Sequence, residues 1–107
     1  MADRTPMIAG NWKMHKTCAE AEAAAAALVS LTAEATSVEV MIAPPHTALV
    51  PAAAAVKGSN VLLGGQNLHW ERQGAFTGEV SAAMLLSAGC THVIIGHSER
   101  RQFFGDR

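Results

Sequence analysis

The most apolar short run of the sequence, residues 93–95, leads through Gly96 into five polar residues: His97, Ser98, Glu99, Arg100 and Arg101. The run is typical of a buried parallel strand, so these side chains are expected just past its carboxyl end. A helix that begins at His97 would disfavour protonation of the imidazole, because its amino terminus carries partial positive charge. A neutral imidazole there could donate a hydrogen bond to a substrate carbonyl.

Polar residues also follow three other apolar runs of the chain, namely Asn11 and Lys13, Pro45 and His46, and Gln66 and Asn67. The carboxyl ends of parallel strands lie on one edge of a sheet, so the four groups are expected to converge. Lys13 is a fixed cation suited to a phosphate or a carboxylate, and Asn11 is a neutral hydrogen-bonding group. The sequence therefore predicts an active or binding site at that edge.

The elements that would position these residues alternate in the order β-α-β-α-β-α-β. Strands are expected at residues 7–10, 38–43, 60–67 and 92–96, and helices at residues 17–35, 49–58, 81–89 and from 97 onward. Thr17 and Glu20 have the spacing of a capping box, and Gly58 and Gly89 are expected to end their helices. Pro51 fits only the first turn of the second helix. Helical crossovers of this kind predict a parallel α/β sheet with right-handed connections.

Composition limits the class of protein. The chain has 107 residues, half of them hydrophobic, and a net charge of −1, which favours one small soluble domain and no nucleic-acid or membrane partner. Cys18 and Cys90 are expected to be free thiols in a reducing cytoplasm. The five histidines lack metal-ligand spacing, and no Walker loop or nucleophile elbow is present, so neither a metal nor a cofactor is predicted.

Four stretches, "AGNWKMHKT", "APPHTAL", "GGQNLHWERQGAFTGEVSAAML" and "VIIGHSERRQFFGD", resemble triosephosphate isomerase in that family's order and spacing. The resemblance covers nearly the whole chain, with local departures at Gly65 and Ala82. It implies the N-terminal half of a (β/α)8 barrel, with four parallel strands alternating with helices. It also implies interconversion of dihydroxyacetone phosphate and glyceraldehyde 3-phosphate through an enediolate, a step of glycolysis and gluconeogenesis.

The resemblance further implies roles for individual residues. Asn11 and Lys13 resemble the substrate-binding pair, and Lys13 also lies near the developing negative charge. His97 resembles the neutral electrophile, Glu99 the carboxylate that pairs with the lysine, and Ser98 a residue that shapes the turn. The loop residues Gly74, Ala75, Phe76, Thr77, Gly78 and Glu79 resemble the family's dimer loop, so a homodimer is implied for the longer protein.

Length is the main departure from the family. An eight-stranded α/β barrel needs about 250 residues, so residues 1–107 are expected to form one incomplete barrel domain. The family's glutamate base, lid and phosphate loops belong to the other half. Of the carboxylates here, only Glu99 is expected at the catalytic edge, and the chain alone is predicted to be inactive. The alternatives are a flavodoxin-like binding module and a non-catalytic half-barrel interaction module.

Overall fold

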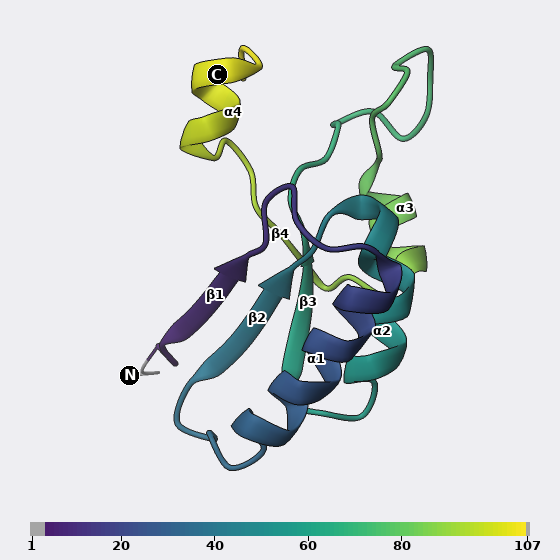
Figure 1. Cartoon of the computed structure of the whole chain (residues 1–107). Helices are drawn as coiled ribbons and strands as arrows, with labels where there is room; N and C mark the ends of the chain where they lie inside the picture. Colours follow the sequence, from purple (N-terminus) through teal and green to yellow (C-terminus); the bar gives the residue numbers. More distant parts are fainter. Residues whose placement is uncertain (1–3, 107) are drawn as a thin grey trace.

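The computed structural model of the protein describes residues 4–106, in which parallel strands alternate with helices (Figure 1). The elements are β1 (Met7–Asn11), α1 (Cys18–Thr32), β2 (Glu39–Ala43), the short 3-10 helix η1 (His46–Ala48), α2 (Leu49–Val56), β3 (Val61–Gly65), α3 (Ala82–Ala88), β4 (His92–Val93) and α4 (Ser98–Phe103). The predicted order of elements is confirmed. Within the described residues, no helix is long and apolar enough to cross a membrane.

The four strands form one parallel sheet in the sequential order β1-β2-β3-β4. Figure 1 shows α1, α2 and α3 together on one side of this sheet, with α4 beyond its carboxyl edge. In a flavodoxin-like fold the first strand lies inside the sheet and helices cover both faces. The observed order and the one-sided helical layer therefore argue against the flavodoxin-like alternative.

The core lies between the sheet and the helices. It contains Ile42 and Leu63 from the sheet, Leu49 and Ala52 from α2, and Leu85 from α3, all at most 5% exposed. Ala21 and Ala25 of α1 are fully buried as well. Small side chains at these positions allow helix and sheet backbones to approach closely, as the alanine-rich sequence predicts.

Three predicted helix ends are confirmed. Thr17 and Glu20 form a reciprocal capping box at α1, and the Ser81 side chain accepts a hydrogen bond from the Met84 N–H at the start of α3. Gly89 ends α3 in the left-handed region, with φ of 105°. These caps satisfy backbone groups that the helix itself leaves without partners.

Several predicted boundaries are wrong, and the differences are largest at β4 and at the end of α1. The last strand was expected at residues 92–96, but β4 contains only His92–Val93. One further backbone bond, from the Ile94 N–H to the Gly65 carbonyl, extends the contact with β3, and Gly96 then turns the chain at φ of 58°. Ile95 is 70% exposed beside the edge strand of the sheet, so the expected burial is also wrong. In addition, α1 ends at Thr32 instead of residue 35.

Candidate functional site

A pocket of about 380 Å³ lies at the carboxyl edge of the sheet. Its lining includes Asn11 at the end of β1 and Lys13 just after it, His46 after β2, Gln66 and Asn67 after β3, and His97 and Glu99 after β4. Polar residues that are widely separated in the sequence are thus brought together because all four strands run in the same direction. The edge at which they meet is the one at which parallel α/β folds bind their ligands.

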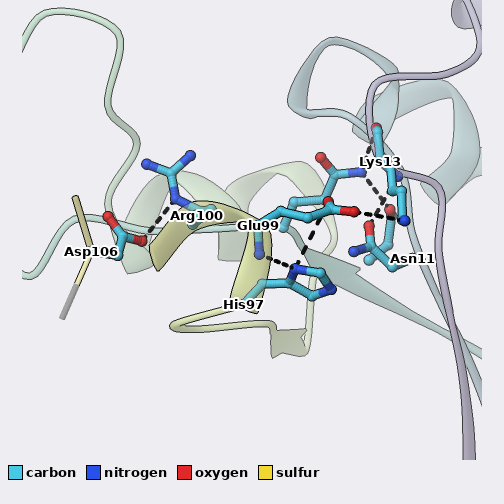
Figure 2. A network of polar contacts seen from close by, with 8 residues as sticks. Asn11, Lys13, His97, Glu99, Arg100 and Asp106 are labelled. Atoms are coloured by element: carbon cyan, nitrogen blue, oxygen red, sulfur yellow. Dashed lines mark hydrogen bonds and ion pairs between the residues drawn. The ribbon is translucent and has the colours of Figure 1, made fainter. Parts of the chain in front are cut away.

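Lys13 and Glu99 form an ion pair across this pocket, with Lys13 Nζ 2.6 Å from Glu99 Oε1 (Figure 2). The hydrogen bond from Lys13 holds the pKa of the Glu99 carboxyl below its ordinary value. Both side chains are about half exposed, so the pair is open to a ligand in the pocket. The Lys13 backbone N–H also donates to Asn11 Oδ1 at 2.9 Å.

His97 is the N-cap residue of α4, as the sequence predicts. The Glu99 backbone N–H donates to His97 Nδ1 at 3.1 Å, so Nδ1 acts as an acceptor and a neutral ring carries its proton on Nε2. Glu99 Oε2 also lies 3.8 Å from Nδ1, but the lone pair of Nδ1 is already used, so this contact is not an ion pair. Ser98 is exposed in the first position of α4.

The long loop after β3 lies partly against the same pocket. Of its six candidate residues, Gly78 and Glu79 line the pocket, Gly74 and Phe76 line a smaller cavity of about 40 Å³ beneath the loop, and Ala75 and Thr77 are exposed. The Phe76 ring stacks on His69 with their centroids 3.9 Å apart. The loop therefore has an internal packing contact of its own, and its tip remains open to solvent.

Two charged residues of the pocket, Glu79 and Arg100, were given no role at the site from the sequence, although Arg100 was expected at this edge. Glu79 was assigned only to the loop, and the expectation that Glu99 is the only carboxylate at this edge is wrong, because Glu79 also lines the pocket. Arg100 lines it too, while its Nε lies 2.8 Å from Asp106 Oδ2. The helical spacing of His97 and Arg100 was a usable signal, since residues three apart share a helix face. Asp3, a further carboxylate, lies outside the described residues.

His46 and Cys90 are both titratable and both partly withdrawn from solvent. Desolvation lowers the pKa of His46, and its Nε2 is buried without a partner among the described residues. Burial raises the pKa of the Cys90 thiol, which lies in the core before β4. The two thiols of the chain, Cys18 and Cys90, are free. Neither cysteine lines the pocket, so the chemistry of the site rests on its lysine, carboxylates and histidines.

Comparison with known proteins gives one consistent result. The family model described as triosephosphate isomerase matches residues 6–107. The chain is 57% identical to the triosephosphate isomerase of Pelobacter propionicus and 54% identical to that of Geotalea uraniireducens, in each case over 96% of this chain and 41% of the relative. The crystal structure of triosephosphate isomerase from Bartonella henselae superimposes with a TM-score of 0.83 at 45% identity, covering 95% of this chain and 42% of that chain.

The chain thus spans about two fifths of the length of the relatives it matches. Its four parallel strands and alternating helices correspond to part of the α/β barrel that those relatives form. The matched region includes β1 to α4 and every described residue of the pocket. On these grounds the chain belongs to the triosephosphate isomerase family.

Proposed function

We propose that this chain supplies the cation, the amide and the electrophile of a triose-phosphate isomerase site. The complete site would interconvert dihydroxyacetone phosphate and D-glyceraldehyde 3-phosphate through an enediolate, without a cofactor. The observation that carries the proposal is the arrangement of Lys13, Glu99 and His97 beside Asn11 in one pocket. The cation and the hydrogen-bond donors among these groups would stabilise the negative charge that develops on the enediolate oxygen.

The proposed roles follow from the chemistry of each group. The Lys13 ammonium binds the anionic substrate and stabilises the negative charge that develops on the enediolate oxygen. Glu99 orients this ammonium at 2.6 Å, and the half exposure of both side chains leaves the ammonium open to a substrate anion. His97, with its proton on Nε2, donates a hydrogen bond to the substrate carbonyl. A neutral histidine in this role is already established for the family and is not a new inference.

Proton transfer between adjacent carbons also needs a base within hydrogen-bond reach. Glu99 is unsuited to this role, because the hydrogen bond from Lys13 lowers its pKa and makes it a weak base. Glu79 also lines the pocket, but it belongs to the long loop, and its Oε1 lies 4.0 Å from His69 Nδ1. We therefore do not assign it the role of base. We infer that the base comes from a part of the barrel beyond residues 1–107, so the chain forms an incomplete domain and is inactive alone.

An assay of the chain alone and in mixture with a C-terminal half tests this division of roles. The half would come from one of the bacterial relatives and would carry the remaining strands of the barrel. We expect no isomerase activity in a coupled assay of the 107-residue chain, and activity when the two halves are mixed. Activity of the chain alone would contradict the inferred absence of a base, provided that it is lost on His97→Gln.

The same proposal includes assembly and location. We infer a homodimer for the longer protein, with residues 74–79 of the long loop after β3 in the interface. The reason is that Trp70, in an earlier part of the same long loop, is 87% exposed. A phosphorylated triose is the small-molecule partner, and neither nucleic acid nor membrane takes part. We also assign the protein to the cytoplasm, since both cysteines are free.

A further inference from the structure

Lys13 has an unusual backbone conformation for a residue with a side chain. Its φ is +56°, in the left-handed region that costs an L-residue about 1–2 kcal/mol. A residue stays in such a conformation only when its surroundings hold it there. The exposed ion pair with Glu99 is too weak a constraint by itself, because exposed pairs contribute little.

Gln66 supplies a stronger constraint. Its side-chain Nε2 lies 2.8 Å from the Lys13 carbonyl oxygen and 2.8 Å from the Ala43 carbonyl oxygen. An amide nitrogen has two N–H groups, so both are used, one on each carbonyl. Ala43 O also accepts the Trp12 backbone N–H at 3.1 Å. The carboxamide, which comes from the residue after β3, therefore joins the segment that follows β1 to the last residue of β2.

We propose that Gln66 is a positioning residue for Lys13, whose backbone it holds in the conformation that presents the ammonium to Glu99 and to the pocket. The proposal rests on the function proposed above, in which Lys13 acts on the substrate. Gln66 acts through Lys13 and needs no contact with the substrate. One of its two bonds fixes the carbonyl of Lys13, the other anchors the carboxamide on the Ala43 carbonyl, and Asn11 Oδ1 accepts from the N–H of Lys13. Both backbone polar groups of Lys13, its N–H and its carbonyl, are thus bonded to side chains.

A titration of Glu99 by NMR in the 107-residue chain tests this role without any assay of activity. Gln66→Met keeps the length of the side chain and removes both donors. Asn60→Leu is the matched control, because Asn60 Nδ2 donates to the Thr32 carbonyl at 2.8 Å at the opposite edge of the sheet. We expect the pKa of Glu99 to rise toward its ordinary value in Gln66→Met and to stay lowered in Asn60→Leu. An unchanged Glu99 titration in folded Gln66→Met would overturn the proposal.

A second measurement needs no substitution and so does not depend on folding of a variant. The two side-chain amide protons of Gln66 should exchange with solvent more slowly than those of Gln102, which is exposed on α4. Slow exchange of both protons supports the double donation. Exchange at the same rate as Gln102 would overturn it.

The third measurement uses the mixture of the chain with a C-terminal half. We expect Gln66→Met to lower kcat by about tenfold or more, since small misplacements of a catalytic group are costly, and Asn60→Leu to leave kcat near normal. A normal kcat in Gln66→Met would contradict the positioning role. Inactivity of the unsubstituted mixture would instead contradict the proposed function, and the Glu99 titration would then decide the role of Gln66.

Discussion

At the scale of single residues, one backbone hydrogen bond determines what His97 can do. The Glu99 N–H donates to Nδ1, so the ring cannot place its proton there without losing the cap of α4. The proton of the neutral ring is therefore on Nε2, and that nitrogen is left to donate to a ligand. His97 is thus proposed both to cap α4 and to polarise the substrate carbonyl.

Replacement of His97 tests this combination of roles. His97→Gln should lower kcat of the reconstituted site by about two orders of magnitude or more, the usual contribution of a general acid or base. The Michaelis constant should change much less, because Asn11 and Lys13 remain. Steady-state kinetics of the mixed halves would measure both. His92→Gln is the control, since His92 lies at the start of β4, away from the pocket, and a kcat near normal in His97→Gln would refute the assignment.

At the scale of elements, the end of α3 depends on a residue without a side chain. A Cβ added at Gly89 would lie 2.7 Å from the Ala53 Cβ of α2, and the φ of 105° already disfavours any other residue. Gly58 offers a matched comparison, because its φ is also positive, at 76°, but a Cβ there meets nothing within 4 Å. A comparison of substitutions at Gly58 and Gly89 therefore distinguishes the cost of backbone strain from the cost of steric contact.

Substitution of both glycines gives a direct prediction for stability. Gly58→Ala should lower the free energy of unfolding by about 1–2 kcal/mol through left-handed strain alone. Gly89→Ala should cost about 1–3 kcal/mol more, because it also forces α2 and α3 apart. Urea denaturation of the two variants would measure the difference. Equal losses would show that the contact with Ala53 is relieved at no cost.

The elements also show what the sequence could and could not predict. Helix ends at Thr17, Ser81 and Gly89 are local signals, because the capping side chain or the left-handed glycine acts within one turn. The end of β4 is not local: residues 93–95 look like a buried strand, yet only a neighbouring strand or helix could bury them. Likewise, Glu79 reaches the pocket through the path of a long loop, which no pattern of spacing specifies.

The hydrogen bonds that join segments within the site could not be predicted from the sequence either. Convergence of Asn11, Lys13, His97 and Glu99 follows from parallel strands and could be predicted. The two bonds of Gln66 to the Lys13 and Ala43 carbonyls could not be, because they depend on the positive φ of Lys13. A sequence pattern identifies which side chains meet at an edge, but the backbone contacts that hold them need coordinates.

At the scale of the whole molecule, the sheet offers two incomplete edges. Among residues 4–106, β1 pairs only with β2, and β4 pairs only with β3. Apolar side chains beside these edges are exposed, including Ile8 at 61% and Ile95 at 70%. Open apolar edges favour association with further strands. This supports the proposal that a part of the barrel beyond residues 1–107 supplies the remaining strands and, with them, the base.

The long loop provides the last prediction, which concerns assembly of the reconstituted barrel. The rings of Trp70 and Phe76 both pack on His69, but Trp70 is 87% exposed, so its side chain is open to contact with a partner. Large aromatic residues are the usual anchors of protein interfaces. We expect the mixed halves to sediment as a dimer of barrels at micromolar concentration, and Trp70→Ser to raise the dissociation constant at least about tenfold. Leu31→Arg, at an 83% exposed site on α1, should leave assembly unchanged, whereas sedimentation of the unsubstituted mixture as single barrels would refute the interface.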